Sequence, residues 1–197
     1  MDRSFRYPDE NGRFLVRPIT PDDRELINAS FNELSPQSKY LRFFQSANRL
    51  SEYQLKYLTN PDGVNHVAWG ILDTTVEPHQ GVCAFRFIRL KDDPEVAESA
   101  ITVLDRFQGQ GLSKVAFSVL NILAAELGVK RFRHHVLYQN SVVNKSLDKL
   151  GVISSYVESG VHIKETPVFA SAKQMSDHPQ LKGLRKTMMF VQQKLKQ

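Results

Sequence analysis

Two glycines, Gly109 and Gly111, stand directly before a segment whose apolar residues recur every three or four positions. That spacing predicts a helix from Leu112 to Leu127 that Gly128 ends, and residues 100–104 before the turn predict a buried strand. At such a strand-turn-helix junction, free backbone amides and the positive end of the helix dipole converge, and glycine lets an anion approach the main chain. The residue types and their spacing therefore predict a phosphate-binding turn.

Several kinds of glycine turn share this general pattern. The dinucleotide-binding pattern Gly-x-Gly-x-x-Gly requires glycine where Lys114 stands, and the P-loop pattern is absent. An ordinary connection between a strand and a helix is a further alternative. The pattern Arg106-x-x-Gly109-x-Gly111, set in Val-x-Asp-x-x-Gln-Gly-x-Gly-Leu, resembles the pyrophosphate loop of the GNAT acetyltransferases.

This resemblance implies that acetyl-CoA is the co-substrate and that its contacts are mostly with the backbone. The strand before the turn would hold the pantetheine arm through its main chain, and the turn would hold the pyrophosphate. The residues that the resemblance assigns to coenzyme binding are Val103, Leu104, Arg106, Gly109, Gln110, Gly111, Leu112, Ser113 and Asn140. Lys114 is either a further phosphate contact or an exposed helix residue.

Two other segments are similar to the acetyltransferase domain of bacterial Pat-type protein lysine acetyltransferases. One is Pro36-x-Ser38-x-Tyr40-Leu41-Arg42-Phe43-Phe44, and the other is the acidic run at residues 93–98. The similarity covers roughly residues 13–168. It implies a protein lysine as the acceptor, such as one on an acyl-CoA synthetase, while a cyclic-nucleotide-binding or synthetase-like domain has no room in 197 residues.

Acetylation of an amine needs a base, because a free lysine amine has a pKa near ~10.4. Glu98 is the candidate, at the position that resembles the base of the Pat-type domains. We expect its carboxylate to lie in apolar surroundings that raise its pKa toward neutrality. A solvent-facing carboxylate with no such role is the alternative, and Glu95 is the second candidate base.

The segment from Asn140 to Gly151 resembles a GNAT segment in which asparagine contacts the coenzyme and a tyrosine protonates the leaving thiolate. Leu147 stands at the position of that tyrosine, so the general acid is left open between solvent and Tyr138. Asn144 is expected on the helix surface more than at the coenzyme.

Composition limits the class of protein. With 41% hydrophobic residues, 197 residues suit one domain with a sizeable core, and the lone Cys83 is expected in a buried strand. No segment reaches membrane-spanning length, so a cytoplasmic protein without a membrane partner is expected. The net charge of +5 is spread along the chain, which makes nucleic acid an unexpected partner. His134 and His135 are adjacent on a predicted strand and point to opposite faces, so no metal site is expected.

The predicted elements alternate in an order that matches the GNAT fold: an α+β fold with a mixed, mostly antiparallel sheet flanked by helices. Strands are predicted at 13–19, 66–73, 81–90, 100–104, 131–137, 152–157 and 161–168, and helices at 20–34, 35–44, 51–59, 112–127 and 140–150. Residues 1–12 form a tail or short hairpin, 13–170 the acetyltransferase domain, and 171–197 include an amphipathic helix. Three roles are open for that helix: it docks on its own domain, it forms a dimer contact, or it covers the acceptor cleft.

Three functions remain open from the sequence. The first is acetylation of a protein lysine by a monomer or homodimer, with Glu98 as the base. The second keeps the chemistry but uses a small amine or amino acid, which a closed, apolar or carboxylate-lined pocket would favour. The third is a non-catalytic acyl-CoA-binding module, which the leucine at position 147 favours and Glu98 opposes.

Overall fold

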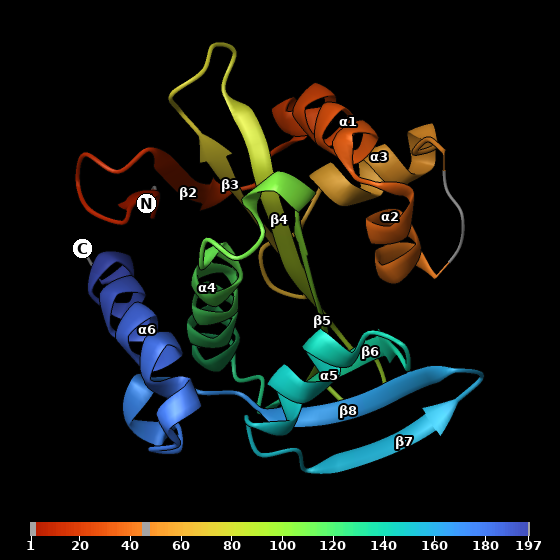
Figure 1. The fold of residues 1–197 in the computed structure, drawn as a ribbon, viewed down its shortest axis with the longest axis vertical. Helices are drawn as coiled ribbons and strands as arrows, with labels where there is room; N and C mark the ends of the chain where they lie inside the picture. Colours follow the sequence, from red (N-terminus) through yellow and green to blue (C-terminus); the bar gives the residue numbers. More distant parts are fainter. Residues whose placement is uncertain (1–2, 45–47, 197) are drawn as a thin grey trace.

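The computed structural model describes residues 3–44 and 48–196 and shows an α+β fold built on one sheet (Figure 1). In the described residues the sheet has eight strands in the order β1-β2-β3-β4-β5-β6-β8-β7. All neighbouring pairs are antiparallel except β5 and β6, which confirms the predicted mixed sheet. The strands are β1 Phe5–Tyr7, β2 Phe14–Pro18, β3 His66–Asp73, β4 Gln80–Arg89, β5 Val96–Val103, β6 Arg131–Leu137, β7 Ser154–Glu158 and β8 Val161–Pro167.

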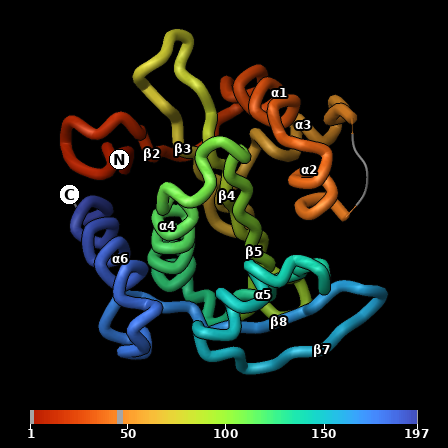
Figure 2. The backbone as a smooth tube through the Cα atoms, in the orientation of Figure 1, coloured from red at the N-terminus to blue at the C-terminus, as the bar shows by residue number. Residues whose placement is uncertain are grey.

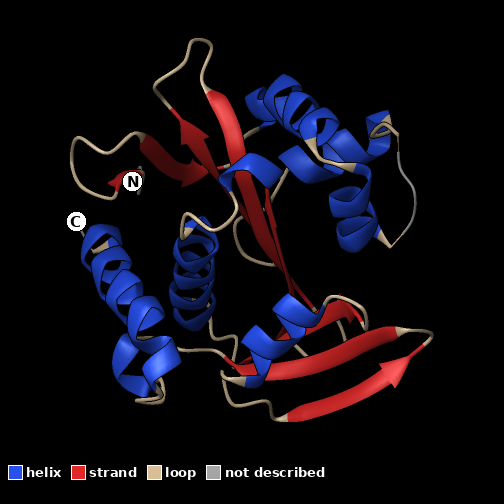
Figure 3. Ribbon diagram, viewed as in Figure 1, coloured by secondary structure: helices blue, strands red, loops and turns tan. Residues whose placement is uncertain are grey.

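Helices cover both faces of the central strands. The α-helices are α1 Arg24–Glu33, α2 Pro36–Phe43, α3 Glu52–Thr59, α4 Leu112–Glu126, α5 Ser141–Asp148 and α6 Lys182–Leu195. The helices α1, α2 and α3 lie on one side of β4, and α4 and α6 lie on the other (Figure 3). The helix α4 packs on β4 and β5 and also against α6, so it is buried between the sheet and the last helix.

Capping residues explain most of the helix starts. The Ser35 side chain accepts a hydrogen bond from the Ser38 amide at the start of α2, and Ser51 forms a capping box with Gln54 at the start of α3. The helix predicted from position 20 begins later, at Arg24. Residues 21–23 form a 3-10 turn instead, because the Asp23 carboxylate accepts from the Thr20 amide at 2.8 Å.

The two ends of the described chain lie close together (Figure 2). Arg3 donates to the Leu195 carbonyl at 3.2 Å and pairs with Glu126 at the end of α4. Phe5–Tyr7 pairs with β2, so the first twelve residues include a hairpin strand. The predicted amphipathic helix is present as α6, with Met188, Val191 and Leu195 buried among the core residues.

The sheet opens between its two parallel strands. The strands β5 and β6 are paired only over residues 96–98 and 131–133, although β5 continues to Val103 and β6 to Leu137. Beyond Glu98, β5 keeps its pairing with β4 and β6 keeps its pairing with β8. Within the described residues, one edge of β5 therefore has no strand partner from Ser99 to Val103, and the glycine turn follows directly at the end of that edge.

Candidate active site

The glycine turn has the conformation that the sequence predicts. Gly109 and Gly111 have φ angles of +76° and +86°, a region that other residues adopt only at a cost in energy. Gly111 is the N-cap of α4, so the amides of Leu112 and Ser113 have no acceptor within the helix. A Cβ at Gly109 would have no heavy atom within 4 Å, so the approach to this backbone is open. Such a turn can hold a pyrophosphate through main-chain amides.

The hydrogen bonds at the two ends of β5 show which backbone groups face its open edge. The Leu104 amide donates to the Val82 carbonyl and the Val96 carbonyl accepts from Leu90, both at 2.9 Å. Because backbone groups alternate in direction along an antiparallel ladder, even-numbered residues face β4 and odd-numbered residues face the open edge. The backbone of Ile101 and Val103 thus points into the opening, where the Val103 carbonyl accepts from the Gln108 side chain at 3.3 Å. The Leu104 amide predicted to face the coenzyme is bonded to β4 instead.

Side chains around the turn are engaged with other parts of the protein. The Arg106 guanidinium lies 3.0 Å from the Glu33 carboxylate of α1, and the Gln110 side chain donates to the Arg106 carbonyl. The Lys114 ammonium lies 3.0 Å from the position that a Cβ on Gly183 would take, so this lysine extends toward α6. The site for an anion therefore consists of backbone groups, with Arg106 near it but paired.

Asp105 connects the turn to α2. Its carboxylate accepts from the Ser35 amide at 3.0 Å, the Ser35 hydroxyl at 2.8 Å and the Ser38 hydroxyl at 2.7 Å. Burial alone would raise the pKa of Asp105, but these hydrogen bonds from Ser35 and Ser38 hold it below its usual value. The carboxylate thus fixes the start of the turn to the helix that carries the Pat-like segment.

Glu98 lies on β5 at the point where β6 turns away. Its side chain is 46% exposed, so the apolar surroundings predicted from the sequence are wrong. The strand pattern looked apolar, but where β5 pairs with β6 at Arg133 the Glu98 side chain reaches solvent. The Glu98 carboxylate lies 3.5 Å from Nε2 of His135, which is also exposed. The predicted base therefore faces solvent beside an imidazole.

His134 occupies the opposite face of β6, as predicted for adjacent strand residues. Its ring nitrogens bond to the hydroxyls of Ser99 and Thr166, each at 2.9 Å. Burial, and to a smaller degree the neighbouring His135, lower the pKa of His134 to about 4, so the ring is neutral at physiological pH. His134 thus joins β5, β6 and β8 where the sheet begins to open.

The comparisons with known proteins agree with this geometry. No protein-family model matches the sequence. Acetyltransferase Pat of Mycolicibacterium smegmatis is 32% identical over 155 residues, which make up 79% of this chain and 46% of Pat. An acetyltransferase of Pseudomonas aeruginosa is 27% identical over 123 residues, 62% of this chain and 66% of the relative. The chain therefore spans less than two thirds of the length of either relative.

Some solved structures are single domains that this chain covers almost completely. The GNAT domain of S. lividans PAT is 29% identical, with a TM-score of 0.70 over 78% of this chain and 90% of that domain. The chain belongs to the GNAT acetyltransferase family. An acetyltransferase from Salmonella typhimurium, solved with its cofactor acetyl-CoA, shares the GNAT fold with a TM-score of 0.62 at 13% identity, over 80% of this chain and 95% of that one.

The GNAT segment after β6 is present but differs from the sequence expectation in its contacts. The Asn140 side chain caps α5 by accepting from the Val143 amide at 3.3 Å. Asn144, expected on the helix surface, is buried: it donates to the Leu137 carbonyl and bonds to Nδ1 of His162 at 3.0 Å. Leu147 is buried in the core. This position of the GNAT fold therefore offers no general acid in this chain.

The described residues fit acetyl-CoA better than a metal ion. The open edge of β5 offers main-chain groups to an extended arm, and the turn offers amides to a pyrophosphate. Among residues 3–44 and 48–196, no three His, Cys, Asp or Glu side chains are grouped to hold a metal ion. No helix in the same residues is long and apolar enough to cross a membrane.

Proposed function

We propose that this chain transfers an acetyl group from acetyl-CoA to the side-chain amine of a protein lysine. The observation that supports this most strongly is the opening of the sheet: the free edge of β5 leads to the glycine turn at one end and starts at Glu98 at the other. The Pat-like segment in α2 and the identity with Pat favour a protein acceptor.

The backbone of the chain does most of the binding in this proposal. The main-chain groups of Ile101 and the amide of Val103 bind the pantetheine arm, and the amides of residues 109–113 bind the pyrophosphate at the N-terminus of α4. Acetyl-CoA supplies the acetyl group as a thioester, which a neutral amine attacks directly. The protein then has to orient the two reactants and remove a proton from the amine.

Glu98 removes that proton in the proposed mechanism. A carboxylate Oε of Glu98 accepts it from the lysine ammonium at the mouth of the opening. His135 lies 3.5 Å away and both side chains reach solvent, so the imidazole offers a route by which the proton leaves. General acid-base catalysis of this kind typically accounts for ~10²–10⁴ in rate. The leaving thiolate takes its proton from solvent, because Leu147 is buried.

The test is acetyl transfer measured by intact-protein mass with two acceptor sets: acyl-CoA synthetases and other lysine-bearing proteins, and free amines and amino acids. We expect acetylated lysines in the first set. Glu98→Gln should lower kcat by about 100-fold at neutral pH while leaving the Kd for coenzyme A unchanged. Glu95→Gln tests the second candidate base, and Glu158→Gln, at an exposed residue of β7 without an assigned role, is the matched control that should have no effect.

Each alternative has its own outcome in the same assay. An unchanged kcat for Glu98→Gln would show that Glu98 is not the base. Turnover with free amines alone would move the chain to small-molecule acetylation. Binding of coenzyme A with no turnover in either set would contradict catalysis and support a binding module.

A further inference from the structure

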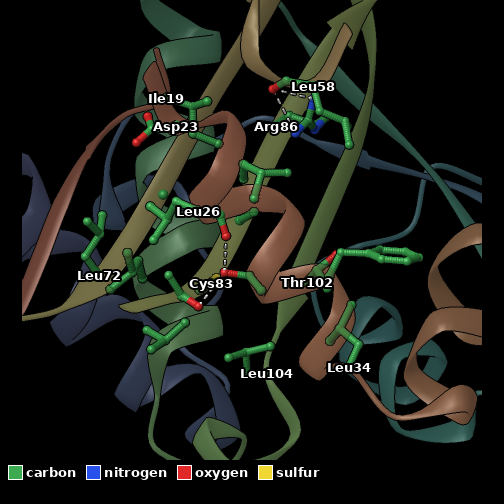
Figure 4. Close-up of a pocket in the computed structure, with 18 of the residues that line it drawn as sticks. Ile19, Asp23, Leu26, Leu34, Leu58, Leu72, Cys83, Arg86, Thr102 and Leu104 are labelled. Atoms are coloured by element: carbon green, nitrogen blue, oxygen red, sulfur yellow. Dashed lines mark hydrogen bonds between the residues drawn. The ribbon is translucent and has the colours of Figure 1, made fainter. Parts of the chain in front are cut away.

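A cavity of about 80 Å³ lies between α1, α2 and α3 on one side and the strands β3, β4 and β5 on the other (Figure 4). Its lining reaches Thr102 on β5 and Leu104 just after it but includes none of residues 109–113, so it is separate from the glycines of the turn. Apolar side chains form most of its wall, among them Ile19, Leu26, Phe31, Leu34, Phe43 and Leu50.

Besides Arg17 of β2, which pairs with Asp23, two arginines line this cavity, Arg42 of α2 and Arg86 of β4. Arg86 is only 5% exposed, and Arg42 is partly buried. Neither guanidinium forms an ion pair with a carboxylate of the described residues. Arg86 donates to the Leu58 carbonyl at 3.4 Å from each terminal nitrogen and lies 3.1 Å from Nε2 of His66. These are few and long contacts for a group with five N–H donors.

The charges around the cavity do not balance within the described residues. The carboxylate in the lining, Asp23, is already paired with Arg17 at 2.5 Å. His66 is neutral, because burial and then the charge of Arg86 lower its pKa to about 4. Burial and the charge of Arg42 lower the pKa of Arg86 to about 10, so it remains protonated at neutral pH. Buried cations without a counter-charge are costly, so an anion is expected here.

The size and polarity of the cavity limit the anion. A water-sized group needs roughly 10–15 Å³ of such a cavity, so a volume of 80 Å³ holds about five to eight groups of this size. Arg86 lies at one end of the cavity, beside Leu58, while Leu34 and Leu104 lie at the other (Figure 4). A molecule that fits has a negatively charged head and a short apolar body. Inorganic phosphate has the charge but no apolar part, so it would leave the apolar end of the cavity unfilled.

We propose that this cavity binds a small aliphatic carboxylate, whose oxygens contact the guanidinium groups of Arg42 and Arg86 and whose hydrocarbon part lies toward Leu34 and Leu104. The planar donor fork of arginine matches the two oxygens of a carboxylate. The site lies under α2 and beside β5, outside the coenzyme-binding turn. It does not depend on which acceptor the enzyme acetylates.

The proposal is tested by titrating the full chain with isovalerate and, in parallel, with the neutral isovaleramide, which has almost the same shape. Binding is measured by calorimetry and by ligand-detected NMR, with and without saturating coenzyme A. We expect isovalerate to bind at least about tenfold more tightly than the amide, because the charged hydrogen bonds are lost in the amide. Coenzyme A should not displace it.

Variants locate the binding. Arg86→Gln and Arg42→Gln should each weaken isovalerate binding by about tenfold. Arg24→Gln is the matched control: Arg24 lies on α1, pairs with the exposed Glu52 and does not line the cavity. Equal binding of acid and amide, no binding of isovalerate at millimolar concentration, or displacement by coenzyme A would each overturn the proposal. The comparison of acid with amide uses the natural chain, so it decides the matter even if an arginine variant does not fold.

Discussion

The glycine turn and the arginine cavity border the same strand, β5, but they are built from different parts of the chain. The turn is one continuous segment, residues 104–113, and offers backbone amides whose direction depends on local φ angles. The cavity is assembled from helices α1, α2 and α3 and strands β3, β4 and β5, and its charged groups are side chains. The turn should therefore be sensitive to backbone strain, and the cavity to changes of charge.

The largest effect that we expect beside the cavity is a dependence of stability on pH through His66, which contacts Arg86. Its pKa is about 6.5 in the unfolded chain and about 4 in the folded protein, so the unfolded chain binds more protons between these values. This contribution to the free energy of unfolding is complete above pH 6.5 and is lost as the pH falls toward 4. We expect a loss on the order of 2–3 kcal/mol over that range.

Urea unfolding at a series of pH values measures this contribution. His66→Gln should show a smaller fall in the free energy of unfolding between pH 6.5 and 4, because the variant has no proton to take up there. His134 contributes in the same direction and remains in the variant. His79→Gln, a change at an exposed histidine, serves as the control. The same pH dependence in all three proteins would contradict the assignment to His66.

In the turn, Gly111→Ala should raise the KM for acetyl-CoA by about tenfold, because an L residue at φ +86° costs on the order of 1–2 kcal/mol and displaces the amides. The matched control is Gly128→Ala, which has φ +82° at the other end of α4 and no heavy atom within 4 Å of a Cβ. Both variants should lose similar stability, but only Gly111→Ala should weaken coenzyme binding. An equal change of KM in both would show that the turn acts only through stability.

The smallest effect concerns Asp105, which joins the two regions. Asp105→Asn removes the charge that accepts from Ser35 and Ser38, and should lower the free energy of unfolding by about 1 kcal/mol. We expect only about a threefold rise in the KM for acetyl-CoA, since the amides of the turn remain in place. Asp92→Asn in the exposed loop before β5 is the control. A loss of coenzyme binding as large as that of Gly111→Ala would show that the two regions are not independent.

The difference between a continuous segment and a site assembled from distant elements also explains what could be predicted from the sequence. The turn, the helix α4 and most strand bounds follow from residues close together in the chain, and β3 and β6 match the predicted bounds to the residue. The surroundings of Glu98 could not be predicted, because its exposure depends on β6 leaving β5, which no local pattern records.

The cavity was missed for a related reason. In an alternating strand, Arg86 looks like a solvent-facing residue, and only the packing of α1, α2 and α3 over that face buries it. Arg42 did stand in the Pat-like segment, but nothing near it in the sequence indicates its neighbour. Asn144 is likewise expected on the helix surface from the sequence, but in the structure β8 brings His162 into hydrogen-bond contact with it. Side chains that meet across distant elements leave no signal at fixed spacing.

The unpaired edge of β5 also bears on solubility. A strand edge with free N–H and C=O groups can recruit a strand from another chain, and an exposed edge is therefore a common starting point for aggregation. From Ser99 to Val103 this edge lies between β4 and the departing β6 in the strand order, so it borders a gap within the sheet and is not one of the two outer edges. A strand from another copy would have to enter this gap to pair there, whereas the outer edge of the sheet at β7 is limited to five residues.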